Sequence, residues 1–274
     1  MFAIIQAEFQ KMKRYHILLI GIFGMACSPL LQMFSQAVMA EEYKNQHFDF
    51  AALVNATIWG NATIFLPVLV TLIGGYLINR EYADDTLKNI LTVPVSFRRL
   101  LAGKLAAITL LAVILGVFSM GITVIVSLCA GLPALNPLAL ARGTLQTAGL
   151  AVGVCVVTAP LTILCSRRPG SFMSGSVVAF IAGYSCMFFK NGIMRDIYPF
   201  SAVLTLIGFD STDWAGTSER GSLLWGAASL GVMLLLSLLL LGAAKPPETA
   251  QKRRRKKGRA ARRGRSSNKR TSLQ

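Results

Sequence analysis

The sequence predicts an all-α polytopic membrane protein with six transmembrane helices. Of its 274 residues, 54% are hydrophobic and only 15% are charged, and the mean hydropathy is +0.56. Six stretches of at least 21 residues carry no charge, and a helix that spans a membrane needs about 20 residues. The core of an ordinary soluble protein does not hold six such stretches. In lipid they must be helical, because a helix satisfies its own backbone groups.

The spans are expected near residues 17–40, 55–78, 105–131, 143–166, 169–189 and 221–244. Together with the N-terminal residues they form one membrane domain over residues 1–244. The remaining residues, 245–274, show no apolar periodicity and are predicted to be a disordered basic tail.

The first 16 residues are predicted to form an interfacial helix that leads into the first span. Phe2, Ile5, Phe9 and Met12 recur every three or four residues, so they share one helix face. An ordinary basic flank of the first span is an alternative. A signal peptide cleaved after Ala40 is another, although 24 uncharged residues are long for such a segment. Whether residues 1–40 are processed stays open.

Small residues recur at helical spacing in the fourth and fifth spans. Gly149 and Gly153 are four residues apart, as are Gly175, Ala179 and Gly183. Such spacing lets helix backbones approach closely in lipid. We interpret these residues as helix-packing positions inside the protein, with a subunit interface as the alternative.

The segment between the fifth and sixth spans is the long outer connection. Its apolar run from Phe200 to Phe209 has ten residues, too few to cross a bilayer. This run is predicted to be a re-entrant or interfacial segment on the outer face, or else a hydrophobic patch of an ordinary loop.

The basic residues predict the orientation. With a cytoplasmic N-terminus and six alternating spans, 23 of the 28 Lys and Arg residues lie inside and five lie outside. Both termini are therefore expected in the cytoplasm, and the protein in the inner (plasma) membrane. The tail holds 13 of the basic residues and is expected to bind anionic lipid, with nucleic acid the less favoured partner. The densest cluster is Arg253, Arg254, Arg255, Lys256 and Lys257.

The sequence lacks the motifs of several chemistries. It has no G-x-x-x-x-G-K-[ST] phosphate loop, no G-x-S-x-G elbow and no H-E-x-x-H pair. It has two His residues, five Cys residues without a C-x-x-C pair, and no ionisable residue at the centre of a span. We therefore expect no catalytic residues, cofactor or metal in this chain, and an energy source in a partner.

Residues 79–104, "NREYADDTLKNILTVPVSFRRLLAGK", are the amphipathic exception between the second and third spans. Leu87, Ile90 and Leu91 form one stripe of a short helix, and Asp84 and Asp85 suit its N-terminus. The helix should stop before Pro94. Ser96 is then expected to cap a second helix that begins at Phe97 and enters the third span.

This stretch resembles the corresponding loop of type-2 ABC transporter permeases. The residues that match the recurring pattern of that family are Glu81, Thr86, Leu87, Ile90, Leu91, Pro94, Ser96, Arg98, Arg99, Gly103 and Lys104. The amphipathic lead-in, the six spans and the long outer segment extend the resemblance over residues 1–244. It looks closest to the small permeases of lantibiotic or bacitracin self-protection.

The resemblance implies that two permease subunits, identical or different, form the membrane pore above two ATP-binding subunits. The short helix would be a coupling helix that docks on the ATPase, which binds ATP and Mg. The implied docking residues are Glu81, Asp84, Asp85, Thr86, Leu87, Ile90, Leu91 and Pro94. The implied function is export of a peptide or amphipathic substrate, linked to antibiotic resistance; the cargo itself stays open.

Three other interpretations remain. The protein could be a non-transporting membrane interaction or sensor protein that acts through its basic tail. It could be a membrane enzyme acting on lipid, for which the sequence offers no polar site. The amphipathic helix could also rest on lipid headgroups, although its acidic residues disfavour an anionic surface.

Overall fold

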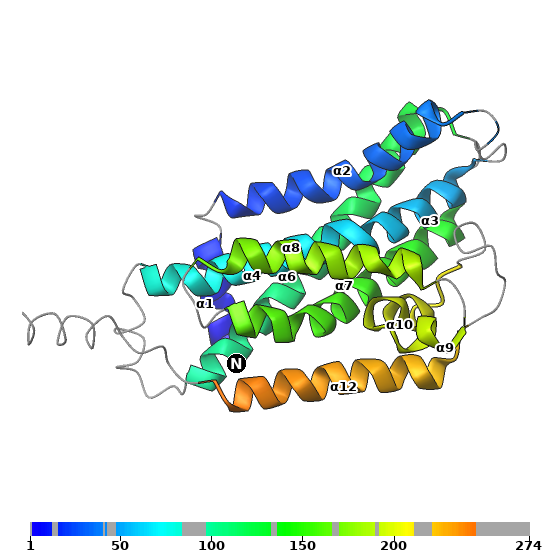
Figure 1. Ribbon diagram of the computed structural model, residues 1–274. Coiled ribbons are helices and arrows are strands. Elements are labelled where there is room, and N and C mark those ends of the chain that lie inside the picture. Colours follow the sequence, from blue (N-terminus) through cyan, green and yellow to red (C-terminus); the bar gives the residue numbers. More distant parts are fainter. Residues whose placement is uncertain are drawn as a thin grey trace, which may run out of the picture. The chain divides into compact units, whose positions relative to one another are not determined.

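The computed structural model describes residues 2–12, 16–40, 42, 48–83, 97–132, 136–165, 170–189, 192–210 and 221–244 (Figure 1). All regular secondary structure within these ranges is helical, and no strand occurs in them. The prediction of an all-α protein is therefore confirmed for the described part of the chain.

Among the described residues, five helical segments are long and apolar enough to cross a membrane. They are α2 (Ile17–Val38), a continuous run of α3 (Phe50–Gly60), η1 (Asn61–Phe65) and α4 (Leu66–Ala83), then α6 (Phe97–Cys129), α7 (Pro137–Cys165) and α12 (Leu223–Gly242). The expected span at 169–189 corresponds to α8 (Phe172–Tyr184) and the 3₁₀ turn η2 (Ser185–Phe188), an apolar but shorter helix. The count of six spans stays a prediction.

Local capping explains why two helices begin earlier than the expected spans 55–78 and 143–166. The Asp49 side chain accepts a hydrogen bond from the Ala52 amide at 2.8 Å, so α3 starts at Phe50. Asn136 Oδ1 accepts from the Leu138 amide at 3.0 Å, with Pro137 in the first helical position. The expected start of a helix at Phe97 is confirmed by α6.

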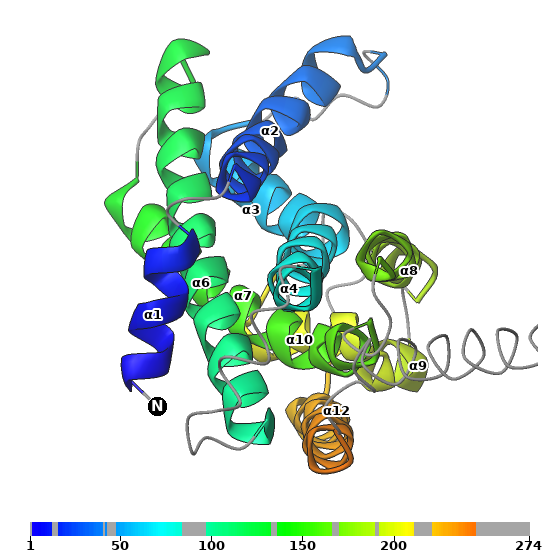
Figure 2. The same cartoon turned by 90° about the vertical axis from the view of Figure 1, so that its left-hand side faces the viewer.

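Helix α4 lies at the centre of the bundle within the compact unit Met1–Ala243 (Figure 2). It contacts α2, α6, α7 and α8, and its Leu66 and Ile73 are almost fully buried. Many buried hydroxyls donate to the carbonyl four residues earlier in their own helix, as Thr71 does to Pro67 at 2.8 Å. These hydroxyls need no partner on a neighbouring helix.

A π-helical turn, η1, interrupts the middle of the second span. Within it Asn61 is fully buried, and its Nδ2 donates to Ser119 Oγ of α6 at 3.3 Å. Ser119 Oγ in turn donates to the Met25 carbonyl of α2 at 3.1 Å. These two hydrogen bonds join three spans at one level.

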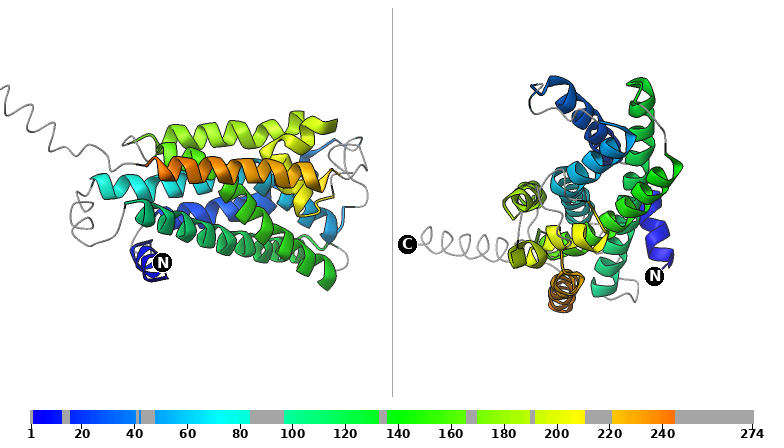
Figure 3. Two further views of the ribbon diagram at one scale, coloured as in Figure 1. Left: turned by 90° about the horizontal axis from the view of Figure 1, so that it is seen from below. Right: turned by 90° about the vertical axis from the view of Figure 1, so that its right-hand side faces the viewer.

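Two short helices lie at the end of the bundle opposite α1: α9 (Gly192–Ile197) and α10 (Pro199–Leu206). They pack against α12, which runs along one side of the unit (Figure 3). Asp196 Oδ2 accepts from the Ser222 amide at 2.9 Å, which ties α9 to the start of α12. The expected re-entrant segment thus folds as α10, with Phe200 and Val203 buried. Its depth in a bilayer stays a prediction.

Helix α1 (Phe2–Met12) runs crosswise to the long helices and contacts α6 (Figure 2). Met12 at its end is 1% exposed and belongs to the apolar core, while Ile5 and Phe9 pack against that core. The apolar face predicted for this helix therefore faces the protein.

Candidate functional site at the helix ends that flank residues 84–96

The amphipathic stretch between the second and third spans falls between the end of α4 at Ala83 and the start of α6 at Phe97. Seven of the expected docking residues lie outside the described residues: Asp84, Asp85, Thr86, Leu87, Ile90, Leu91 and Pro94. Glu81 lies in the last turn of α4. The described part of the site consists of its two flanking helix ends, the end of α4 and the start of α6.

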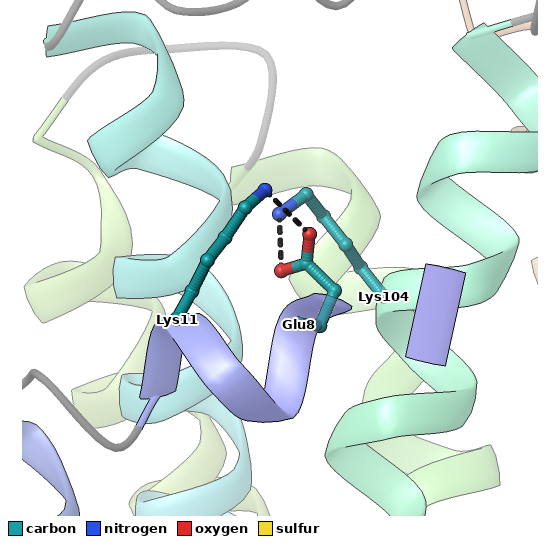
Figure 4. Close-up of polar contacts among 3 residues, drawn as sticks. All are labelled: Glu8, Lys11 and Lys104. Atoms are coloured by element: carbon teal, nitrogen blue, oxygen red, sulfur yellow. Dashed lines mark hydrogen bonds and ion pairs between the residues drawn. The ribbon is translucent and has the colours of Figure 1, made fainter. Parts of the chain in front are cut away.

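A buried ion pair holds the beginning of α6. Lys104 Nζ lies 2.8 Å from Glu8 Oε2 of α1, and both side chains are 3% exposed. Lys11 lies one turn after Glu8 on α1, and its Nζ is 2.9 Å from the other carboxylate oxygen, Oε1. Figure 4 shows both ammonium groups at the Glu8 carboxylate, one on each oxygen. Helix α1 is thus attached to α6 two turns after α6 begins.

The two lysines determine the charge state of Glu8. Burial by itself raises the pKa of this carboxyl, because the charged form loses hydration. The charges and hydrogen bonds of Lys104 and Lys11 outweigh that effect and hold the pKa below its ordinary value. Glu8 is therefore ionised at neutral pH, and the pair is a charged one.

The end of α4 is held by a different helix. Asn79 is 6% exposed; its Oδ1 accepts from the Gly170 amide at 3.0 Å, and its Nδ2 donates to the Gly75 carbonyl at 2.8 Å. Gly170 adopts a positive φ of 82° just before α8. The amide side chain of Asn79 thus connects α4 to the turn from which α8 starts.

Close packing reinforces this connection between α4 and α8. A Cβ placed on Gly75 would lie 2.5 Å from Phe172 Cβ, so only glycine permits this approach. The Phe172 ring meets Tyr76 edge-on at a centroid distance of 6.0 Å. Arg80 Nη1 donates to Tyr76 Oη at 2.7 Å, so Arg80 lies beside the contact between Tyr76 and Phe172.

The two helices that enter and leave residues 84–96 are therefore fixed to different partners. Helix α4 is attached to α8, and α6 is attached to α1. A displacement of residues 84–96 would act on two helix ends that have different polar attachments. Each attachment involves buried groups that are costly to separate.

The expected helix-packing residues lie at three contacts. Gly183 faces the Thr63 carbonyl of η1, and Gly175 faces Cys165 Sγ of α7; in both places an added Cβ would clash. Ala179, between them on α8, is 1% exposed. Gly153 and Gly149 of α7 instead face the α10 region, where Val203 and Ile207 would meet an added Cβ at 2.5 and 3.2 Å.

A polar cleft of about 520 Å³ lies at the opposite end of the bundle. Its polar side chains hold the turn that follows α10: Asn55 Nδ2 donates to the Asp210 carbonyl at 3.0 Å, and Gln146 Nε2 donates to the Gly208 carbonyl at 2.9 Å. Arg142 Nη2 also donates to the Gly208 carbonyl, at 3.3 Å. These groups fix the position of the turn.

No group of three His, Cys, Asp or Glu side chains suitable for a metal occurs among the described residues. The basic cluster Arg253, Arg254, Arg255, Lys256 and Lys257 lies outside them.

Sequence reasoning did not find the Glu8–Lys104 pair. Lys104 was recognised only as an inner basic residue and as part of the family pattern, and Glu8 was given no partner. One available signal was that Glu8 is the only acidic residue before Glu41. A lone acid in a basic lead-in helix needs a cationic partner once it is buried.

The architecture and these helix attachments define a multi-pass helical membrane protein built around a polar connection between its second and third spans. A family model described as ABC-2 family transporter protein matches residues 4–186, which run from α1 into η2 and include residues 84–96. The chain belongs to this family, whose members are membrane components of ABC transporters and generally work with an ABC ATPase. The comparison with curated proteins returned no match.

Proposed function

We propose that this chain is the permease subunit of an ATP-driven exporter, and that a separate ABC ATPase docks on residues 84–96. The family match over residues 4–186 carries the proposal. In addition, α4 and α6 approach these residues as firmly held helix ends, which is what transmission of a movement requires.

In this mechanism residues 84–92 form the coupling helix. Leu87, Ile90 and Leu91 fill an apolar groove of the ATPase, while Glu81, Asp84 and Asp85 pair with its basic groups. ATP and Mg bind to the ATPase. When the ATPase closes, the coupling helix moves, and the attachments of α4 to α8 and of α6 to α1 carry the displacement into the spans.

The proposed topology has six crossings with both termini in the cytoplasm, on the basis of the basic residues. Helix α8 with η2 supplies the fifth crossing. Its 13 α-helical and four 3₁₀ residues extend about 27 Å, close to the bilayer core of about 30 Å. Residues 1–244 are the permease domain, and the basic tail, 245–274, lies on anionic lipid of the inner leaflet.

The pore is proposed to contain two permease subunits, and the cargo to be a peptide or other amphipathic molecule. Resemblance to permeases of lantibiotic and bacitracin self-protection supports this cargo class and a role in antibiotic resistance. Both statements rest on the sequence pattern of residues 79–104.

The test is co-purification with a candidate ABC ATPase that is co-expressed with this chain. The double change Leu87→Asp and Leu91→Asp should lower the recovered ATPase by about tenfold or more, because it places unpaired charge in an apolar contact. Leu138→Asp is the matched control: Leu138 is 76% exposed in the first turn of α7, at the other end of the bundle.

Unchanged ATPase recovery and unchanged resistance in the double variant would rule out the proposal. Loss of function on deletion of residues 252–270, with residues 84–96 tolerant of change, would instead favour the interaction or sensor protein.

A further inference from the structure

An apolar groove of about 200 Å³ opens between α6, α7 and α12, apart from the attachments described above. From α6 it is lined by Ala102, Leu105, Ala106 and Thr109, and from α12 by Leu234 and Leu238. These are residues from the beginning of α6 and the end of α12, so the groove lies in the half of the bundle that carries α1.

The hydroxyl groups in the groove do not make it polar. Thr109 Oγ1 donates to the Leu105 carbonyl at 3.0 Å, and Ser237 Oγ donates to the Met233 carbonyl at 2.7 Å. Thr162 Oγ1 likewise donates to the Thr158 carbonyl at 3.0 Å. Each hydroxyl bonds within its own helix, so the groove offers its occupant mainly hydrocarbon.

Two exposed arginines, Arg98 and Arg99, precede on α6 the residues that line the groove. Arg98 precedes Ala102, Leu105 and Thr109 by 4, 7 and 11 residues, which places all four on one face of α6. Arg99 precedes Ala102 and Ala106 by 3 and 7 residues and falls on the same side. None of the described residues that line the groove is acidic. Arg98 and Arg99 therefore bring positive charge to the end of the groove at the beginning of α6.

The dimensions fit one leaflet of a bilayer. Eleven residues of helix separate Arg98 from Thr109, or about 16 Å, and half of a bilayer core is about 15 Å. A volume of about 200 Å³ is below the range of about 300–1,000 Å³ typical of small-molecule pockets. A single acyl chain suits such a space better than a bulky cargo molecule does.

We propose that this groove binds one anionic phospholipid, with an acyl chain between α6 and α12 and its phosphate headgroup on Arg98 and Arg99. Lys104, on the same helix, does not take part because its ammonium group is held by Glu8. The bound lipid covers the weakly packed side of α12 and anchors the start of α6 at the level of the headgroups.

The experiment uses the full chain in phosphatidylcholine vesicles that contain a photoactivatable probe with a diazirine in its acyl chain. The probe is phosphatidylglycerol in one sample and phosphatidylcholine in the other, and labelled peptides are mapped by mass spectrometry. We expect phosphatidylglycerol to label residues 102–109 and 234–241 more strongly than phosphatidylcholine does, by about fivefold for each arginine engaged. This comparison needs no variant.

Two variants then distinguish contacts with the lipid headgroup from contacts with the acyl chain. Arg98→Gln with Arg99→Gln should remove the preference for phosphatidylglycerol, whereas Arg142→Gln, an exposed arginine on α7 at the other end, should keep it. Ala106→Phe should fill the groove and reduce labelling by both probes. Leu110→Phe, one turn further on and 46% exposed outside the groove, should leave labelling unchanged.

Equal labelling of the two regions by both probes would overturn the proposal, since headgroup charge would then play no part. Labelling that persists in Ala106→Phe would also overturn it, because the chain would lie elsewhere. Neither readout requires ATPase or export, so failure here is distinguishable from failure of the proposed function.

Discussion

At the scale of single residues, the Glu8–Lys104 pair is the feature with the most direct consequences. Both side chains are 3% exposed and come from helices 96 residues apart in the chain. A buried charge that loses its partner is costly, whereas replacement of both partners by apolar residues often is not. The pair therefore acts as a specific attachment of α1 to α6.

Substitution of one partner should destabilise the protein strongly. Glu8→Gln should lower the free energy of unfolding by about 3–5 kcal/mol, because the charge of Lys104 then stays buried without compensation. Lys104→Met should cost less, because Lys11 still pairs with the Glu8 carboxylate. The double variant should be much less affected than the sum of the two. Thermal unfolding in one detergent measures this cycle, and additive losses would show that the two groups do not interact.

Lys11 serves as the internal comparison for that cycle. Its side chain is 39% exposed, although it lies 2.9 Å from the same carboxylate. Lys11→Gln should cost no more than about 1 kcal/mol, since exposed ion pairs contribute little.

The pH dependence follows from the lowered pKa of Glu8. In the unfolded chain this carboxyl takes up a proton near its ordinary value of 4.5, before the folded form does. Its stabilising contribution is thus fully present above about pH 5.5 and is lost as the pH falls through the lower pKa of the folded state. The stability difference between the unchanged protein and Glu8→Gln should be constant at neutral pH and shrink below about pH 4.5. A difference that grows on acidification would contradict the assignment.

At the scale of helices, the second span is the most irregular element. It contains the π-helical turn η1 and then Pro67, which has no amide hydrogen to donate to the Thr63 carbonyl four residues earlier. Gly183 of α8 packs directly against that carbonyl. A span with this irregularity needs a neighbour without a side chain at the same level.

Gly183→Ala should therefore destabilise the protein by about 1–3 kcal/mol, because the new methyl group has to displace the backbone of η1. Gly231→Ala is the matched control: Gly231 also lies within a span, and an added Cβ there meets nothing within 4 Å. That change should be neutral or slightly stabilising. Equal unfolding midpoints for the two variants would refute a close contact at Gly183.

Helix positions were largely predictable from the sequence, because uncharged length alone decides which segments cross lipid. The expected span at 17–40 became α2, Ile17–Val38. Helix starts that are set by a side chain were less predictable. Asp49 and Asn136 cap two helices that begin before the expected spans 55–78 and 143–166. The π-helical turn left no periodic signal in the sequence.

For the candidate site, the sequence indicated where the site lies but not which residues hold it in place. The amphipathic pattern of residues 79–104 drew attention to the connection itself. Its attachments were not predictable, because the partners of Lys104 and Asn79 are 96 and 91 residues away along the chain. A single sequence gives no information on which distant polar residues meet.

At the scale of the whole molecule, we propose a permease in which residues 84–96 receive the movement of an ATPase. In this proposal two attachments, Asn79 to Gly170 and Lys104 to Glu8, distribute that movement to α8 and α1. This arrangement explains why a chain that avoids charge elsewhere keeps buried polar contacts on both sides of one short polar segment. The decisive question is therefore which molecule contacts residues 84–96.

Photo-crosslinking from position 87 answers that question most directly. Leu87 is replaced by benzoylphenylalanine in the full chain, which is co-expressed in cells with a candidate ABC ATPase. Leu138 is replaced in the same way as a control. We predict a covalent adduct with the ATPase from position 87 and none from position 138. Adducts with lipid alone from position 87, with the ATPase present, would show that the segment rests on the membrane and would contradict the proposed coupling.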